Sequence, residues 1–255
     1  MSTITLTFCD RAENHIHMEQ IGELHSNGFS LQDLIDIKNH FKEEEDAAAV
    51  IHDLSPPDDF YKIDNKAYLL IIKNGVDKLI NNNNKLRLKM EQFTLKPDSK
   101  VYLHGKVVNK IARHNLCFDS TGHPPDYINK KGTVIAYDKV PFTNLLKQKI
   151  EEITKQKNFV CEGNYYYDLK KCGINFHGDT ERKKVIGVRL GNSMPLYFQW
   201  FLQNKPIHDT IKFTLNDGDI YVMSEKTVGF DWKLSFNKLT LRHAAGCHTK
   251  FHTII

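Results

Sequence analysis

The chain has 255 residues, of which 40% are hydrophobic and 26% are charged. This length suits one large domain, or a core domain with a smaller partner, and the composition is that of an ordinary soluble globular protein. No run of apolar residues approaches the roughly 18 that would indicate a membrane-spanning helix. Residues 1–10 lack the basic and apolar regions of a secretory signal. We therefore expect an intracellular protein, of the cytoplasm or nucleus, that is neither secreted nor inserted in a membrane.

The cysteine count argues against a disulfide framework. The five cysteines are Cys9, Cys117, Cys161, Cys172 and Cys247, an odd number without a Cys-x-x-Cys pair. Free thiols of this kind are typical of a reducing compartment.

Charge is unevenly distributed along the chain. Residues 1–95 contain 10 Lys/Arg and 16 Asp/Glu, whereas residues 96–255 contain 25 and 15, a net charge of +10. The approach to the second part carries Lys96, Lys100, Lys106, Lys110 and Arg113. Such a balance suits a polyanionic partner such as DNA or RNA, and a solvated basic surface without any partner explains it equally well.

Residues 1–95 are predicted to form a small mixed α/β unit of unknown role. Residues 4–8 alternate like a strand, residues 31–41 follow a helical period after Ser30, and residues 67–72 form a short apolar run before Asn74-Gly75. The asparagine run at 81–84 is typical of a linker, so we place a domain boundary after residue 95. A long surface loop within one domain is the alternative.

Residues 96–255 are predicted to be mostly β, which makes the whole chain α+β. Short apolar runs alternate with turn signals such as Lys131-Gly132 and Gly191-Asn192, and one amphipathic helix begins at Pro141. Many short strands at this spacing indicate a β-sandwich or barrel.

His177-Gly178-Asp179 is the segment with the clearest chemistry. On a strand, residues two apart point to the same face, so the imidazole and the carboxylate can bind one metal ion. Two histidines and one carboxylate on one face of an octahedron form the site of non-haem Fe(II) oxygenases, which leaves the other positions open. Alone, the pair is a weak signal, and a surface histidine in a chain with 13 of them is the competing interpretation.

The surroundings of this pair resemble the AlkB-like family of Fe(II)/2-oxoglutarate-dependent dioxygenases. In order, they are an Asn-x-Tyr segment with Asn164 and Tyr166, the His177-x-Asp179 pair, a strand ending at Leu190-Gly191, a Gly218-Asp219 strand, and His243. The resemblance covers residues 100–255. Residues 1–95 have no recognisable counterpart in the core of that family.

The resemblance implies a double-stranded β-helix, or jelly roll, over residues 96–255. It also implies Fe(II) bound by His177, Asp179 and a distal histidine, which are then both the metal ligands and the catalytic residues. The implied co-substrates are 2-oxoglutarate and dioxygen, and the implied reaction is oxidation of a substrate C–H bond. For this family, oxidative demethylation of DNA or RNA bases is the expected activity. Hydroxylation of a protein or small molecule, or a non-catalytic jelly roll that only binds, are the alternatives.

The distal ligand departs from the family's pattern. The usual spacing from Asp219 lands on Trp232, so we take His243 as the ligand, delayed by an insertion. The competing alignment makes Arg242 a residue of the co-substrate site and leaves the ligand missing or replaced by Asp231. Neighbouring residues of a strand face opposite ways, so Arg242 and His243 are not both expected to point inward.

The sequence does not decide which residues would bind 2-oxoglutarate. The resemblance assigns co-substrate contacts to Asn164 and Tyr166. A guanidinium binds a carboxylate through two parallel hydrogen bonds, so Arg189 and Arg242 are candidates for the far carboxylate, and Lys250 is the cation that follows His243. A structural zinc site of His243, Cys247, His248 and His252 is a further alternative for the last residues.

Overall fold

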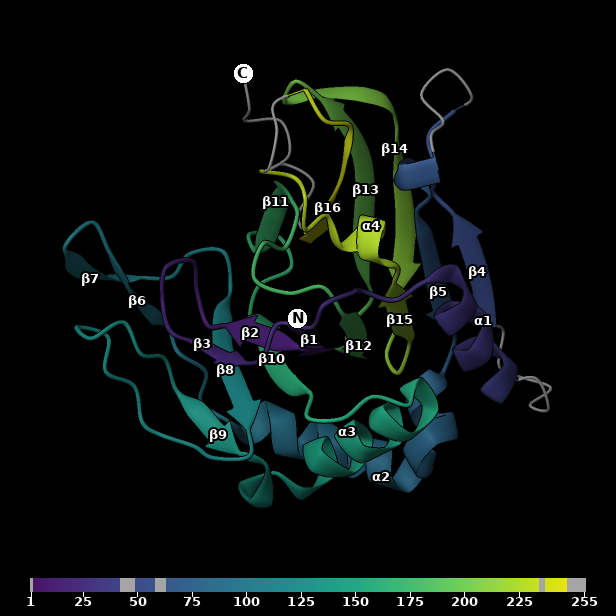
Figure 1. Ribbon diagram of the computed structural model, residues 1–255. Coiled ribbons are helices and arrows are strands. Elements are labelled where there is room, and N and C mark those ends of the chain that lie inside the picture. Colours follow the sequence, from purple (N-terminus) through teal and green to yellow (C-terminus); the bar gives the residue numbers. More distant parts are fainter. Residues whose placement is uncertain (1, 42–48, 58–62, 234–236, 247–255) are drawn as a thin grey trace.

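The structure is a computed structural model that describes residues 2–41, 49–57, 63–233 and 237–246. The chain is mostly β, with several sheets and helices packed on one of them, as Figure 1 shows. The expected α+β class, with more residues in strands than in helices, is therefore confirmed. None of the helices in the described ranges is both long and apolar enough to cross a membrane.

A large sheet of eight strands runs through the middle of the molecule. Its strand order is β4-β5-β15-β12-β1-β10-β8-β9, and every neighbouring pair is antiparallel except β8 and β9. The strands are β1 (Thr3–Cys9), β4 (Ala49–Asp53), β5 (Tyr68–Ile72), β8 (His114–Asp119), β9 (Val134–Ala136), β10 (Val160–Tyr166), β12 (Val185–Gly191) and β15 (Ile220–Met223).

A smaller antiparallel sheet has the order β11-β16-β13-β14. Its strands are β11 (Gly173–His177), β13 (Met194–Leu202), β14 (Lys205–Leu215) and β16 (Thr240–Gly246). Two hairpins stand apart from both sheets, and in Figure 1 one of them projects to the left of the large sheet. They pair β2 (Arg11–Glu13) with β3 (Gln20–Gly22), and β6 (Lys100–Leu103) with β7 (Lys106–Asn109).

Helices cover the outer face of the large sheet (Figure 1). They are α1 (Leu31–His40), α2 (Gly75–Thr94) and α3 (Pro141–Thr154), and the short α4 (Glu225–Val228) joins β15 to the segment before β16. Two short 3-10 turns, η2 (Ile63–Asn65) and η3 (Tyr137–Lys139), complete the elements. α1 begins at a capping box between Ser30 and Asp33, as the sequence predicts.

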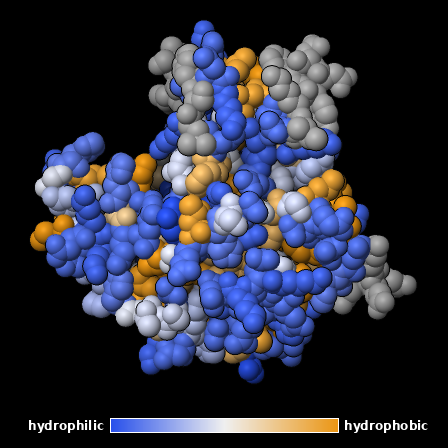
Figure 2. All heavy atoms as spheres, viewed as in Figure 1, coloured by the Kyte–Doolittle hydropathy of each residue, from blue (hydrophilic) through white to orange (hydrophobic). Residues whose placement is uncertain are grey.

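Strand alternation divides the side chains of the large sheet between two cores. On β1, Ile4, Leu6 and Phe8 join the core under the helices, whereas the threonines between them face the small sheet. A second core fills part of the space between the sheets and includes Phe198 and Leu241. The rest of that space is a polar cavity. Figure 2 shows the outer surface on one side, which is largely hydrophilic with small separate apolar groups.

The boundary expected after residue 95 does not divide the sheets. β1, β4 and β5 lie in the same sheet as strands from residues 96–255, and β1 is hydrogen-bonded between β10 and β12. The strand pairing therefore makes residues 1–95 part of the main body.

The expected linker at 81–84 is wrong, because these asparagines lie within α2. Asn81 has non-helical backbone angles (φ 62°, ψ 163°) that kink the helix, and its side-chain oxygen accepts a hydrogen bond from the Asn84 amide. This hydrogen bond caps the second half of the helix, so the run marks a kink within a helix where a linker was expected.

Candidate metal centre

A cavity of about 300 Å³ lies between the two sheets. Alternate residues of four large-sheet strands and of the facing small-sheet strands line it. The large sheet contributes Thr5 and Thr7 of β1, Glu162, Asn164 and Tyr166 of β10, Val185 and Arg189 of β12, and Tyr221 and Met223 of β15.

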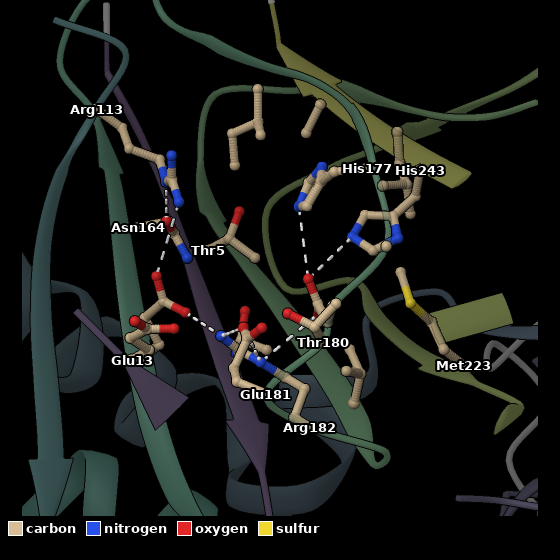
Figure 3. Close-up of a pocket in the computed structure, with 18 of the residues that line it drawn as sticks. Thr5, Glu13, Arg113, Asn164, His177, Thr180, Glu181, Arg182, Met223 and His243 are labelled. Atoms are coloured by element: carbon tan, nitrogen blue, oxygen red, sulfur yellow. Dashed lines mark hydrogen bonds and ion pairs between the residues drawn. The ribbon is translucent and has the colours of Figure 1, made fainter. Parts of the chain in front are cut away.

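His177, Asp179 and His243 meet on the wall of this cavity. Their potential ligand atoms all lie within 4.8 Å of one another. Oδ1 of Asp179 is 3.5 Å from Nε2 of His177 and 3.6 Å from Nε2 of His243. Figure 3 shows both imidazoles turned toward the same carboxylate oxygen.

The small sheet brings the two histidines together. His177 and His243 are direct partners across β11 and β16, and their rings are 4.4 Å apart between centroids. A register shift between Ile174 and His177 lets Ile174 and His177 both line the cavity, although they are three positions apart in β11. An inserted residue of this kind changes which side chains face inward, and such bulges are frequent beside functional sites.

Hydrogen bonds that involve main-chain atoms fix His177 and Asp179. Nδ1 of His177 lies 2.8 Å from the Asn175 carbonyl oxygen. A carbonyl only accepts, so Nδ1 carries the proton and Nε2 keeps its lone pair for a metal. The amide of Asp179 donates to the Val228 carbonyl oxygen of α4 at 3.1 Å, which ties the loop after β11 to that helix.

The electrostatics of the cluster favour metal binding. Burial alone would raise the pKa of Asp179, but the Arg182 guanidinium, with contributions from His243 and His177, holds that pKa well below its usual range. Burial, together with the neighbouring His177, lowers the pKa of His243. One carboxylate and two imidazoles form a donor set that fits a divalent transition metal.

Arg189 lies on the same cavity and is only 1% exposed. Its Nη1 donates to Thr5 Oγ1 at 2.6 Å and lies 3.8 Å from Met194 Sδ, and its Nε has no hydrogen-bond partner within the described ranges. No carboxylate of those ranges forms an ion pair with it, and burial lowers its pKa. A buried guanidinium without a counterion is costly, so the arrangement favours an anionic ligand in the cavity.

The neighbours of Arg189 add polar groups to this part of the cavity. Tyr166 and Tyr221 line it, and none of the residues that the structure describes forms a hydrogen bond with either hydroxyl group. The ring of Tyr221 lies directly over Gly187, where a Cβ atom would be 1.9 Å from the ring. Asn164 accepts hydrogen bonds from Asn115 Nδ2 at 2.9 Å and from Arg113 Nε.

The remaining sequence candidates fall outside the cluster. Arg242 points away from His243 and packs between Phe201 and Trp232, with its carbon Cζ 4.2 Å and 5.0 Å from the two ring centroids. It donates to Asn204 Oδ1 at 2.6 Å and does not line the cavity. The expectation that Arg242 and His243 face opposite ways is therefore confirmed, and the assignment of Arg242 to the co-substrate site is wrong.

The alternative ligands are also separated from the cluster. Asp231 forms ion pairs with Lys226 at 2.8 Å and Lys238 at 3.2 Å, so it does not replace the distal histidine. Lys250 lies outside the described residues, as do Cys247, His248 and His252 of the zinc alternative. The other four cysteines are free, buried thiols.

The polar cavity residues that the sequence did not single out include Thr5, Arg182 and Tyr221. Arg182 lies three residues after Asp179 in an irregular loop, so no periodicity marks it. Thr5 comes from residues 1–95, which the resemblance does not cover. Tyr221 carried a usable signal, because it alternates with Met223 on a strand expected next to the site.

No protein-family model matches the chain. A curated relative is "Uncharacterized protein R156" of Acanthamoeba polyphaga mimivirus, which is 45% identical over 247 residues. The match covers 96% of this chain and 96% of the relative. The chain belongs to the family of this mimivirus protein. Because the match spans almost the whole chain, the kinship with the mimivirus protein extends over both sheets.

Proposed function

We propose that the protein is an Fe(II)- and 2-oxoglutarate-dependent dioxygenase of the AlkB-like kind. The observation that supports this proposal is a single cavity that contains both a possible metal site and a buried cation. One wall presents the cluster of His177, Asp179 and His243, and the same cavity holds the buried, unpaired Arg189. A transition metal and an organic anion are the two ligands that such an enzyme needs side by side.

The fold proposed for this function is a double-stranded β-helix. The order of the strands supports it, because β10 to β16 pass between the two sheets as large, small, large, small, small, large, small. This alternation is how a jelly roll of two Greek keys is wound. The next strand of the series belongs in the large sheet beside β10. In this chain β1 occupies that place, paired with both β10 and β12.

Each part of the cavity has a role in the proposed activity. His177, Asp179 and His243 would hold Fe(II), which when bound supplies the redox chemistry that activates dioxygen. Arg189 would bind the far carboxylate of 2-oxoglutarate. Tyr166 and Tyr221 offer hydroxyl donors to the same co-substrate.

The sides of the cavity separate the reaction from bulk water. Val185, Leu196, Met223 and Ala245 are among the apolar side chains that line it. A cavity of about 300 Å³ is at the small end for a ligand site, which suits a five-carbon dicarboxylate with the reacting group of a larger substrate.

For the prime substrate we propose an alkylated base in single-stranded or locally opened nucleic acid. The basic hairpin of β6 and β7 supports this class, since Lys100 and Lys106 are exposed there and Arg113 lines the cavity. Backbone phosphates are bound by such cations, and a base must leave its stack to enter a cavity. Lys110 is not part of this surface, because it is buried and donates to Asn14 and Asn115.

Two aromatic runs, at residues 165–167 and 197–201, add little surface on which a base could stack. Tyr165 packs in the core under the helices, and Phe198 and Trp200 lie in the core between the sheets. Tyr167 is the exposed member of its run, with 42% of its surface accessible. Most of these rings therefore pack in the two cores.

The test is succinate formation from 2-oxoglutarate by protein loaded with Fe(II) without oxygen and then exposed to air. We expect turnover in the wild type and none in His177→Ala, Asp179→Ala or His243→Ala, each of which loses iron while staying folded. His40→Ala, an exposed histidine of α1, is the matched control and keeps full turnover. A wild type that binds iron but never consumes 2-oxoglutarate would refute the proposal. Once turnover is seen, methylated oligonucleotides are the first substrates to screen.

A further inference from the structure

The guanidinium of Arg182 lies beside the cluster and contacts three carboxylates. It is buried, with 4% of its side chain exposed, and its Nη2 lies 2.6 Å from both Glu162 Oε2 and Glu181 Oε1. Its Nη1 donates to Cys9 Sγ at 3.5 Å. Its Nε donates to Glu181 Oε1 at 2.9 Å and lies 3.6 Å from Oδ2 of Asp179, which is an ion-pair contact (Figure 3).

The two oxygens of Asp179 therefore have different partners. Oδ1 is the oxygen that lies 3.5 Å and 3.6 Å from the Nε2 atoms of the two histidines. Oδ2 is turned to the guanidinium of Arg182. Nε and Nη2 of this guanidinium both donate to Glu181 Oε1, so Arg182 acts on Asp179 through a permanent positive charge that is held in a fixed place.

The loop that carries Arg182 is held in place by the turn between β1 and β2. The buried carboxylate of Asp10 accepts hydrogen bonds from the amides of Lys183 at 3.1 Å and Lys184 at 3.0 Å. Arg11 Nε donates to the Glu181 carbonyl oxygen at 2.6 Å. The position of Arg182 is thus determined by residues far away in sequence, and its contact with Asp179 is built into the fold.

We infer that Arg182 is a positioning residue of the metal centre: its buried positive charge beside Oδ2 of Asp179 holds that oxygen away from the metal, so that this ligand offers the metal a single oxygen. The inference rests on the metal centre proposed above. A carboxylate with one oxygen so engaged binds in a monodentate manner and takes one coordination position. With the two histidines, that leaves half of an octahedron open for a bidentate co-substrate and dioxygen.

The experiment compares the affinity for Co(II) of wild type and variants by calorimetry, together with the visible absorption of the bound cobalt. Arg182→Met removes the positive charge beside Oδ2 and should weaken Co(II) binding about 10- to 100-fold, the usual loss when a group that orients a metal ligand is removed. It should also change the cobalt absorption, because a freed Oδ2 raises the coordination number. Arg182→Lys keeps a positive charge on a more flexible side chain and should fall between the two.

Arg11→Met is the matched control, since Arg11 binds the same loop without touching Asp179. It should leave both the affinity and the cobalt absorption unchanged, because the hydrogen bonds of the Lys183 and Lys184 amides to Asp10 still hold the loop. Arg182→Met leaves Glu162 and Glu181 without their cation, which threatens folding. The double variant E181Q/R182M reduces this excess charge and provides a second, independent measurement.

The outcomes separate this inference from the proposed function. A wild type that binds no Co(II) would overturn the metal centre and this inference with it. A wild type that binds Co(II) while folded R182M and E181Q/R182M bind it equally well would overturn the role of Arg182 alone. An equal loss in R11M would do the same, because it would assign the effect to the loop as a whole.

Discussion

The hydroxyl group of Thr5 accepts a 2.6 Å hydrogen bond from Nη1 of Arg189, a residue 184 positions away in the chain. The pair joins β1 to β12 across the large sheet and turns a buried guanidinium toward the cavity. It is the only hydrogen bond to an oxygen that Arg189 makes from its side chain within the described ranges.

Thr5→Val removes this hydrogen bond while keeping the shape of the side chain. We expect the affinity for 2-oxoglutarate to fall about tenfold, because a hydrogen bond to a charged group contributes about 1.5–3 kcal/mol. Calorimetry on protein loaded with Ni(II) measures this without turnover. Thr7→Val, on the same face of β1 and without a contact to Arg189, is the control and should bind normally. Equal losses in both variants would show that the strand matters and the hydroxyl does not.

Arg189→Met should separate stability from binding. The change replaces a buried charge that lacks a counterion, so the free energy of unfolding should rise by on the order of 1 kcal/mol. Binding of 2-oxoglutarate should be lost. Urea denaturation without ligand and calorimetry with ligand measure the two effects. A destabilised variant that still binds 2-oxoglutarate would be incompatible with an anion site at Arg189.

Lys110 predicts a dependence of stability on alkaline pH. Burial lowers its pKa to about 8, against 10.5 for the free side chain. Between these values the unfolded chain binds more protons than the folded one, so the contribution of Lys110 to stability rises with pH by about 3 kcal/mol. The measurement is the difference in unfolding free energy between wild type and Lys110→Met from pH 7 to 10.5. The exposed Lys100→Met should show no such slope, and a flat difference for Lys110→Met would contradict the prediction.

Gly187→Ala should destabilise the protein by about 1–3 kcal/mol, the usual cost of forcing a methyl group into a packed site. The reason is the ring of Tyr221, whose Cζ would lie 1.9 Å from the new Cβ. Thermal denaturation measures the loss. In a Tyr221→Ala background the same change should cost much less, since the clash is gone. An equal cost in both backgrounds would place the strain elsewhere.

Local patterns in the sequence were enough for many of the elements and for the placement of His177 and Asp179 side by side. Alternation predicts which residues of a strand share a face, and a spacing of two is therefore readable along the chain. Which strands become neighbours is set by contacts between distant segments, so the place of β1 between β10 and β12 was not predictable. The missed residues Thr5 and Arg182 depend on that placement.

Burial was the second limit of sequence reasoning. Lys110 was counted with the basic surface, yet it forms hydrogen bonds to Asn14 and Asn115 inside the protein. Lysine composition does not reveal such partners, because they come from a turn near β2 and from β8. The prediction of a linker at the asparagine run was wrong for a different reason: the chain is helical on both sides of a kink at Asn81.

The central position of β1 has a consequence for how the protein is made. The strand partners of β1 are residues 160–166 and 185–191. The backbone groups of β1 therefore have no hydrogen-bond partners in the sheet until most of the chain has been synthesised. Contacts so far apart in sequence slow folding and lengthen the time during which an apolar strand is open to aggregation. An expression plan that trims the first ten residues, or attaches a bulky partner next to them, would remove or obstruct the strand that joins β10 to β12.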